Sequence, residues 1–566
     1  MAKRLVIDPI TRIEGHLRID VEVEHGSVQK AWASCTMWRG IENILLGRDP
    51  TEAWLFAQRF CGVCTTVHAL ASVRAVEDAL EILIPPNAQF IRNMILGAHA
   101  LHDHIVHFYH LSALDWIDVT DIPNADPKKA SALGESLSDW PRNSTAEMAA
   151  SKQKVVALLE SGQLGIFAHG YWGHPAMQLP PEVSLLAFSH YLQALEYQRK
   201  ANQVVGMLGG KTPHVQNMTV GGVSNAINPN AGGSLNLDRL YRMKSLIDEV
   251  SAFVHQVYLP DACAIAGLYS DWFEHGAGDR NFLAVPDLPT DARAQTFDLP
   301  GGVIMGGDLA SVRPINTWQD QKLRSAVSED ITHAWYEGKV QAHPWEGETR
   351  DQYTDYQPFG KYSWVKAPRY DGKPMEVGPL AGVLIGYAQG HERTVRWADQ
   401  ALASINAVAR REVTLSSFQS TMGRYAARAI RAAMLAELIQ DHWLRLVDNV
   451  VGGDGRVHTV PRFPPGEVQG VGFHEAPRGT LSHWTVVNDG KLANYQAVVP
   501  TTWNASPRDA GGKPGPYEAA LVGVPIADVN LPLEVLRTVH AFDPCMACAC
   551  HVLSPDGQPV QTIKVL

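Results

Sequence analysis

The chain has 566 residues, a formal net charge of −11 and 19% charged residues. This length exceeds one ordinary hydrophobic core, so two or more subdomains are expected. The acidic balance, without a long block of Lys or Arg, argues against a nucleic-acid-binding surface. The first residues form no secretory signal, and no run of about 18 apolar residues could span a membrane. We therefore expect a chain that is soluble by itself and that a partner must carry if it works outside the cytoplasm.

Hydrophobic periodicity predicts a mostly α fold with smaller α+β lobes around a central body of long helices. Alternation over 4–36 predicts a β-hairpin or meander. Helical periodicity then predicts two long segments, 51–83 and 87–113, separated by a Pro-Pro pair. The Gly-, Pro- and Trp-rich regions favour short strands and long ordered loops, over 275–380 and 451–535. Further helices are expected near 145–162, 181–208, 236–257, 384–410 and 414–447.

These changes of pattern divide the chain into six predicted parts. They are an N-terminal β-rich lobe (1–50), a helical body with the first cysteine pair (51–260), a loop-rich α+β lobe (261–383), a helical hairpin (384–450), a C-terminal lobe with the second cysteine pair (451–551) and a terminal segment (552–566).

Five of the seven cysteines fall into two clusters. The first cluster is R-F-C-G-V-C-T-T-V-H, with Cys61 and Cys64. The second is D-P-C-M-A-C-A-C-H, with Cys545, Cys548 and Cys550. A C-x-x-C spacing lets two thiolates converge on one side of a turn. Two such pairs predict a site for zinc, an iron–sulfur cluster or a nickel/iron centre.

The spacing of the cysteines also allows roles that are not catalytic. The odd number and the clustering argue against a disulfide framework. Two thioredoxin-like motifs would need a βαβ setting that the sequence does not predict. A zinc ribbon joins its pairs over about 15–20 residues, so a structural zinc here would have to tie the two ends of a long chain together. The isolated Cys35 and Cys263 are interpreted as small buried hydrophobic residues.

Residues beside the cysteines favour a functional metal site. Arg59 precedes Cys61 by two positions, and positive charge lowers the pKa of a thiol. His68 follows Cys64 by four positions, one helical turn, and could donate a hydrogen bond to a sulfur ligand.

Motifs along the whole chain resemble the large subunit of nickel–iron hydrogenases. The paired signatures are R-x-C-G-x-C near one end and D-P-C-x-x-C-x-x-H near the other. The resemblance is strongest to the membrane-associated uptake branch, hydrogenase-2 type. It implies the large-subunit fold of that family and an oxidoreductase that reversibly cleaves H2 heterolytically into protons and electrons, mainly for respiratory H2 uptake. Further matches are D-P-I-T-R-I-E-G-H (8–16), M-W-R-G-I-E (37–42), H-D-H-I-V-H-F-Y (102–109), G-G-K-T-P-H (209–214), E-A-P-R-G (475–479) and Y-Q-A-V-V-P-T-T-W-N (495–504).

The resemblance also implies which residues bind metals. Four thiolates would hold nickel, from Cys61, Cys64, Cys545 and Cys548. Of these, Cys64 and Cys548 would also bridge to an iron that carries carbon monoxide and cyanide.

A magnesium ion is implied nearby. Glu42, His551 and the backbone carbonyl of Ala497 match its ligands. Carboxylate and carbonyl oxygens suit a hard cation, whereas the imidazole is taken from the family alone.

The resemblance places Arg478 over the open face of the metals, held by Asp103. The proton acceptor would be this guanidinium or the terminal thiolate of Cys545. Three further residues would surround the site, namely Asp543, His68 and Pro477.

Glu14 matches the first carboxylate of a proton relay. It would take the proton from the sulfur of Cys545 toward solvent. From the residues alone, a structural salt bridge to Arg12 is the simpler interpretation.

The chain would need partners. With no further cysteine clusters it cannot carry an iron–sulfur relay, so an iron–sulfur small subunit is expected in an obligate heterodimer, or in a dimer of heterodimers. A membrane electron-acceptor subunit would be an indirect partner. Export with the small subunit would place the mature enzyme at the periplasmic face of the cell membrane, while its precursor is cytoplasmic.

The family also implies processing of the C-terminus. An endopeptidase would cut between His551 and Val552 once nickel-insertion factors have acted, and would remove 552–566 as a propeptide. We expect the uncut segment to hold the last two ligand thiols near the surface. Cys550, where many relatives carry a small apolar residue, is interpreted as a buried thiol or a redox-sensitive neighbour.

Two weaker patterns are set aside. The sequence G-G-K-T at 209–212 lacks the first P-loop glycine, since that position is Val205. His104, His107 and His110 recur at helical spacing and could bind zinc, but without an H-E-x-x-H pattern packed histidines are favoured. The rival functions are a structural zinc protein and a regulatory H2 sensor of the same fold.

Overall fold

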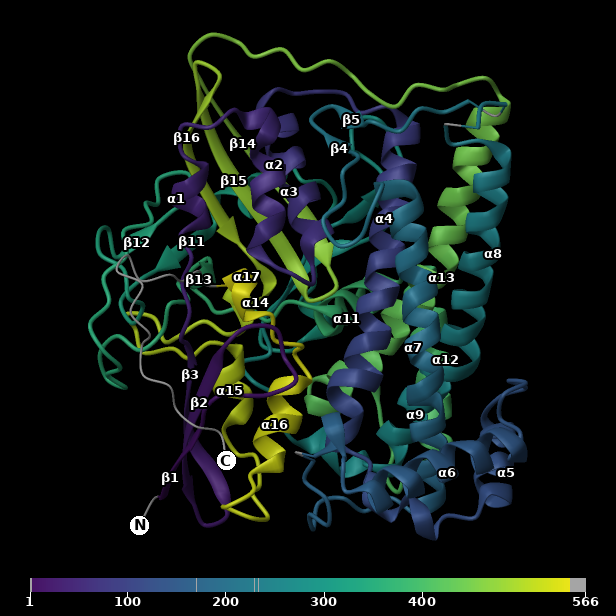
Figure 1. Cartoon of the computed structure of the whole chain (residues 1–566). Helices are drawn as coiled ribbons and strands as arrows, with labels where there is room; N and C mark the ends of the chain where they lie inside the picture. Colours follow the sequence, from purple (N-terminus) through teal and green to yellow (C-terminus); the bar gives the residue numbers. More distant parts are fainter. Residues whose placement is uncertain (1–2, 169, 229, 233, 550–566) are drawn as a thin grey trace.

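The computed structural model describes residues 3–168, 170–228, 230–232 and 234–549. Long helices form one side of the molecule, and sheets with short helices form the other (Figure 1). About 47% of the chain is helix and 17% is strand, which confirms the predicted mostly α class with smaller α+β lobes. The α-helices are α1 (Ile41–Leu45), α2 (Ala53–Ala57), α3 (Thr65–Ala79), α4 (Pro86–Ile105), α5 (Pro127–Leu137), α6 (Thr145–Ser161), α7 (Pro181–Gly209), α8 (Leu237–Phe253), α9 (Leu259–Leu268), α10 (Gln321–Ser325), α11 (Pro379–Ala388), α12 (Glu392–Val408), α13 (Thr421–Val451), α14 (Pro500–Asn504), α15 (Pro516–Leu521), α16 (Leu533–His540) and α17 (Met546–Ala549).

Helix α13 is the centre of the helical body. It is rich in Ala, the best helix former, and its N-terminus is capped by the Ser420 side chain, which accepts a hydrogen bond from Gly423 N. It packs against α4, α8, α9, α11 and α12. Gly97 of α4 faces Ile439 of α13, whose side chain would lie 3.5 Å from a Cβ at that glycine. Small residues therefore let these two helices lie close together.

The strands form small antiparallel sheets. Two three-stranded meanders matter most for the site, β1-β2-β3 and β14-β15-β16. The strands are β1 (Lys3–Ile7), β2 (Leu17–Glu24), β3 (Ser27–Cys35), β4 (Met218–Thr219), β5 (Gly222–Val223), β6 (Phe282–Ala284), β7 (Asp287–Pro289), β8 (Phe297–Leu299), β9 (Gly301–Ile304), β10 (Arg313–Ile315), β11 (Val327–Asp330), β12 (Gln341–Ala342), β13 (Ala367–Tyr370), β14 (Glu467–Ala476), β15 (Gly479–Asn488) and β16 (Lys491–Val498).

Helix α3 lies directly on the β14–β15 hairpin. A Cβ at Gly472 of β14 would lie 2.0 Å from the carbonyl oxygen of Ala71, so only glycine allows this approach. The hairpin closes at the pair Ala476 and Gly479. Its two turn residues, Pro477 and Arg478, are thereby held near the start of α3.

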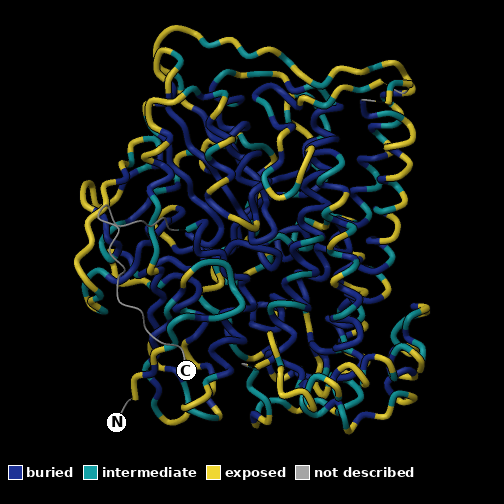
Figure 2. Tube along the Cα trace, viewed as in Figure 1, coloured by how far each residue is buried: buried dark blue, intermediate teal, exposed yellow. Residues whose placement is uncertain are grey.

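The two ends of the described chain meet at one place. Glu14 N donates to Pro544 O (3.3 Å), and Met546 N donates to Glu14 O (2.8 Å). Gly15 has φ +82°, and a Cβ there would lie 2.7 Å from Ala547 N, so the segment after β1 can approach α17 only through a glycine. At this junction Glu14 and Gly15 are half-buried, whereas Cys545 and Cys548 are buried. Figure 2 shows buried residues in the interior of the molecule and exposed residues along the outer helices and loops.

Several predicted boundaries were wrong. The segment 51–83 is not one helix, because the Cys61–Cys64 turn separates α2 from α3. The segment 384–410 is broken between α11 and α12, where Gly390 has φ +69°. Within 451–535 the strands are long, since β14 and β15 have ten residues each. The helix predicted over 87–113 ends in a π-helical stretch, Val106–Ser112.

Among the described residues, no helix is both long and apolar enough to cross a membrane.

Candidate metal centre

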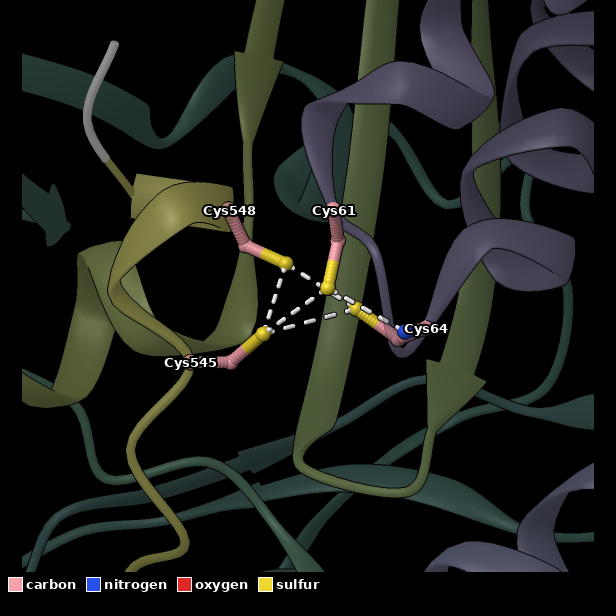
Figure 3. Close-up of side chains that lie close together, drawn as sticks. All are labelled: Cys61, Cys64, Cys545 and Cys548. Atoms are coloured by element: carbon pink, nitrogen blue, oxygen red, sulfur yellow. Dashed lines mark hydrogen bonds between the residues drawn. The ribbon is translucent and has the colours of Figure 1, made fainter. Parts of the chain in front are cut away.

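Four buried thiols converge from the two ends of the chain (Figure 3). Their sulfur atoms all lie within 4.8 Å of one another. The distances are 2.9 Å for Cys64–Cys548, 3.0 Å for Cys545–Cys548, 3.2 Å for Cys61–Cys545 and 3.6 Å for Cys64–Cys545. The predicted convergence of the two C-x-x-C pairs is therefore confirmed.

The first pair is shaped by a turn and a helix start. Val63 N and Cys64 N both donate to the sulfur of Cys61, at 3.1 Å each. Cys64 is the N-cap residue of α3, where the helix dipole favours negative charge. Both features stabilise thiolate over thiol.

Burial opposes ionisation of the cluster. It raises the pKa of Cys64 to about 11 and that of Cys545 well above the usual range. Burial also disfavours the Cys61 thiolate, but hydrogen bonds from the neighbouring thiols outweigh it and lower the pKa of Cys61. One thiolate is therefore favoured while its neighbours keep their protons. A bound cation would supply the charge needed to ionise the rest.

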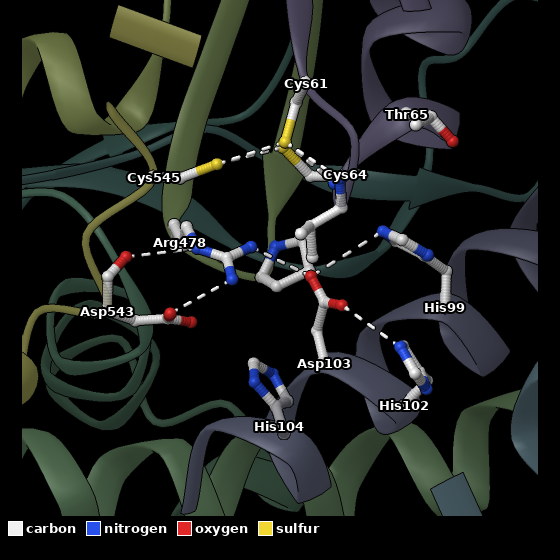
Figure 4. Close-up of polar contacts among 12 residues, drawn as sticks. Cys61, Cys64, Thr65, His99, His102, Asp103, His104, Arg478, Asp543 and Cys545 are labelled. Atoms are coloured by element: carbon white, nitrogen blue, oxygen red, sulfur yellow. Dashed lines mark hydrogen bonds and ion pairs between the residues drawn. The ribbon is translucent and has the colours of Figure 1, made fainter. Parts of the chain in front are cut away.

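Arg478 lies beside the cluster in a cage of two carboxylates (Figure 4). Its Nη1 donates to Asp103 Oδ2 (2.9 Å), its Nη2 pairs with Asp543 Oδ1 (3.0 Å), and its Nε donates to Asp543 O (3.1 Å). Burial lowers the pKa of Arg478, but the two carboxylates outweigh it and raise the pKa above its ordinary value.

A small cavity is lined by Arg478 and by three of the four cysteines. It measures about 10 Å³, close to the volume that one water-sized molecule needs. Arg478, Cys64, Cys545 and Cys548 line it, together with apolar side chains such as Leu481. Arg478 is thus the one arginine among the residues that line this space.

The cage extends to residues that sequence reasoning missed. Arg428 donates from Nη1 to Asp543 Oδ2 (3.2 Å) and to the carbonyl oxygen of Pro477 (3.0 Å). Thr501 Oγ1 accepts a hydrogen bond from Cys545 N (3.2 Å). Arg428 stands in an ordinary Ala-rich helical pattern that carries no signal, whereas Thr501 lies in the Y-Q-A-V-V-P-T-T-W-N motif.

Glu14 touches both the second cysteine pair and its helix. Its Oε2 lies 3.4 Å from Cys545 Sγ and accepts a hydrogen bond from Ala547 N at 2.9 Å. Burial, followed by negative charge on Cys61, raises the pKa of Glu14 to about 7. The alternative salt bridge to Arg12 is not formed, because Arg12 pairs with Asp115 instead.

His68 contacts the cluster at Cys548. Its Nε2 lies 3.2 Å from Cys548 Sγ, and its Nδ1 lies 3.0 Å from His483 Nε2. Burial lowers the pKa of His68 to about 4, so the imidazole is neutral at neutral pH. The predicted hydrogen bond from His68 to a sulfur is present, although the partner is Cys548 and not the nearby Cys64. His483 was not foreseen.

The second predicted site lies around Glu42. Its Oε1 accepts from Ala497 N (2.9 Å), and its Oε2 lies 3.3 Å from Lys366 Nζ. Lys366 also approaches Glu329 Oε2 at 3.4 Å. Two buried carboxylates thus share one ammonium group. Burial raises the pKa of Glu329 to about 7, and a cation beside the two acids would favour their charged forms. His551 lies outside the described residues, as do Val552 and Cys550.

Three other predicted features have clear outcomes. The histidines 104, 107 and 110 do not form a zinc site. His104 contacts Arg428, while the other two contact backbone oxygens of His540 and Tyr191. The isolated Cys35 and Cys263 are buried. The expected surface position of the last ligand thiols was wrong, since Cys545 and Cys548 are buried in the chain that carries 552–566.

Known proteins resemble this chain over its whole length. The sequence matches the family described as nickel-dependent hydrogenase over residues 39–551 and a HoxL-like family over residues 4–34. It is 53% identical to the Hydrogenase-2 large chain of Escherichia coli (strain K12), with 100% of both chains covered. It is 44% identical to the uptake hydrogenase large subunit of Rhizobium leguminosarum bv. viciae, covering 100% of this chain and 97% of that one. A solved structure of the Ni-Fe-Se hydrogenase from Desulfovibrio vulgaris Hildenborough aligns with TM-score 0.78 and 31% identity, covering 97% of this chain and 100% of that one.

Proposed function

Because the chain belongs to the nickel-dependent hydrogenase family and is a catalytic large subunit, we propose that its four-cysteine cluster holds a nickel–iron centre for heterolytic H2 cleavage. The observation that carries this proposal is the convergence of four buried sulfurs within 4.8 Å. The four donors are soft thiolates, with no hard ligand among them, and the cluster lacks the positive charge that would balance four thiolates. These features fit such a centre. Cys64 and Cys548 would be the sulfurs shared with an iron bearing carbon monoxide and cyanide.

When bound, the metal pair supplies the Lewis acidity that polarises H2. The protein groups act on the proton. Cys545 and Arg478 both line the small cavity, so either is placed to accept it. Arg478 is held by two carboxylates and keeps its charge, which makes it a fixed positive group and leaves Cys545 as the favoured acceptor.

Glu14 would carry the proton onward. Its carboxylate oxygen lies 3.4 Å from Cys545 Sγ, and a pKa of about 7 lets it take and release a proton near neutral pH. We expect Glu14→Gln to lower the H2 oxidation rate by about 10²–10⁴-fold, because an amide cannot pass on the proton. Rates are to be compared at equal nickel content. Glu518→Gln is the matched control, since Glu518 is a buried acid whose pKa burial also raises to about 7 and whose hydrogen bonds come from Ala33 N and Tyr362, not from a cysteine of the cluster. An unchanged rate in Glu14→Gln would rule out this relay.

We also propose that magnesium binds at Glu42, with the carbonyl of Ala497 and the imidazole of His551. The carboxylates of Glu42 and Glu329 share the single ammonium group of Lys366, which supports a cation here. Such an ion would tie α1 to β16 and to the end of the processed chain.

An iron–sulfur small subunit is the proposed partner, in a heterodimer or a dimer of heterodimers. Electrons must leave the cluster over a short distance, and the cluster comes within one residue of the surface at the turn between Cys61 and Cys64. Gly62 and Val63 are exposed there, and nearby α1 and α2 carry exposed Ile44 and Leu55. We propose that the small subunit covers this turn.

Val63→Asp tests that placement. Val63 is 36% exposed in the isolated chain, so the acid should be tolerated before assembly. Burying it at the interface should weaken small-subunit binding by at least about 2 kcal/mol, or roughly 30-fold. Val451→Asp, at the exposed end of α13, should leave binding unchanged. If titration gives the two variants equal affinity for the small subunit, the interface does not cover this turn and lies elsewhere.

Processing and location complete the proposal. The nickel-dependent hydrogenase match ends at His551, which supports cleavage between His551 and Val552 by a maturation endopeptidase after nickel insertion. The processed heterodimer would then work at the periplasmic face of the cell membrane, passing electrons to a membrane acceptor subunit.

The first test is elemental analysis of the purified heterodimer. One nickel per large subunit, with iron beyond the content of the partner's clusters, would support the proposed centre. Zinc without nickel in a chain that has lost 552–566 would overturn it in favour of a structural site.

A further inference from the structure

A line of three buried hydrogen bonds leads from the cluster into the β14–β16 sheet. Cys548 Sγ lies 3.2 Å from His68 Nε2, His68 Nδ1 lies 3.0 Å from His483 Nε2, and His483 Nδ1 lies 2.5 Å from Tyr495 Oη. All four side chains are buried. None of these three hydrogen bonds involves Glu14 or Arg478, so the line is separate from the groups proposed to act on the proton.

Three different elements hold this line in place. His68 is on α3, His483 on β15 and Tyr495 on β16. His483 pairs across the sheet with Ala497, and Tyr495 pairs with Thr485, so the two side chains are diagonal neighbours on one face. Phe60, next to Cys61, stacks on His68 (5.2 Å) and meets His483 edge to face (5.5 Å). Packing leaves the imidazoles little freedom to rotate.

The line has one consistent direction when both imidazoles are neutral. With the proposed metal centre bound, Cys548 is a thiolate that can only accept, so His68 must donate from Nε2. Its Nδ1 then has no proton and must accept from His483 Nε2. The Nδ1 of His483 must in turn accept, and the hydroxyl of Tyr495 is the donor that lies there. Each donor fixes the tautomer of the next group.

We propose that His483 and Tyr495 are positioning residues for the metal centre, which lock His68 in the tautomer that donates to the sulfur of Cys548. This inference rests on the proposed nickel–iron centre and extends it to residues more than one contact away from the metals. A hydrogen bond withdraws electron density from a ligand sulfur, so the line would tune the electron richness of the iron that Cys548 shares. Tyr495, without touching a ligand, would set that property.

The test uses the purified heterodimer and its infrared spectrum. Tyr495→Phe removes the last donor while keeping the ring. His483 can then carry its proton on Nδ1 and accept a hydrogen bond at Nε2. His68 would in that case carry its proton on Nδ1, so that its unprotonated Nε2 faces the sulfur. We expect the carbon monoxide and cyanide bands to move to lower wavenumber and kcat to fall by up to about 10-fold, with nickel content unchanged. Tyr362→Phe is the matched control, because it removes a buried hydroxyl that hydrogen-bonds Glu518. It should leave the bands in place.

A second pair of variants keeps the test decisive if Tyr495→Phe fails to mature. His483→Gln retains an N–H that can donate to His68 Nδ1, whereas His483→Leu does not. The bands should shift in the leucine variant and stay near wild type in the glutamine variant. Added to Tyr495→Phe, His483→Gln should restore the wild-type bands.

The outcomes separate two claims. Bands that are present in the wild type but identical in Tyr495→Phe, or equally shifted in His483→Gln and His483→Leu, would overturn the tautomer lock alone. A wild-type heterodimer without nickel and without these bands would overturn the proposed centre, and the tautomer lock with it.

Discussion

Cys64→Ser is expected to remove nickel from the protein and to abolish H2 oxidation. The sulfur of Cys64 lies 2.9 Å from that of Cys548 and 3.6 Å from that of Cys545, inside the buried cluster. A serine hydroxyl is a hard donor that stays protonated, so a soft metal would lose one of its ligands. Because loss of even a hydrogen-bonding partner of a ligand costs about 10–100-fold, loss of the ligand itself should leave under about 1% of nickel and activity.

Cys263→Ser is the matched control for this experiment. Cys263 is equally buried but lies in α9, away from the cluster. The same exchange of sulfur for oxygen there should leave nickel and activity near wild type. Full nickel content in a folded Cys64→Ser heterodimer would show that Cys64 is not a ligand.

Arg478→Lys is expected to lower kcat by about 10²–10⁴-fold while the metals stay bound. Arg478 reaches Asp103 and Asp543 with separate nitrogens, at 2.9 and 3.0 Å. A single ammonium cannot span both carboxylates and face the cavity at the same time. The positive charge is kept, so both buried carboxylates remain compensated and the fold should survive.

Two comparisons separate chemistry from stability at this position. Arg424→Lys alters another buried bidentate pair, with Glu376 at 2.8 Å for both contacts, and should keep the activity. Arg478→Ala would remove the guanidinium from Asp103 and leave Asp543 with Arg428 alone, and it should cost about 3–5 kcal/mol of folding free energy. If Arg478→Lys oxidises H2 at the wild-type rate, the guanidinium has no part in the reaction.

The chemistry of the site was predictable because it depends on residue types at short spacing. Each C-x-x-C pair presents two thiols on one side of a turn. A metal site could therefore be predicted at the place where the two pairs meet. The long helices were also predictable, since α4, α7 and α13 have strong helical periodicity. The break between α2 and α3 was harder to predict, because the Cys61–Cys64 turn interrupts a pattern that looks helical throughout.

The contacts between segments that are distant in the sequence could not be predicted from local patterns. The contact between Glu14 and Cys545, the cage of Asp103 and Asp543 around Arg478, and the line from Cys548 to Tyr495 all connect different elements. Each depends on packing that no local pattern records, such as the close approach that Gly15 and Gly472 permit. Residues such as Arg428 and His483 therefore carry no signal of their own. The sequence by itself determined the ligand types and the helical body, whereas only the tertiary structure decided which charged and hydrogen-bonding groups surround the ligands, because burial and long-range packing set their partners.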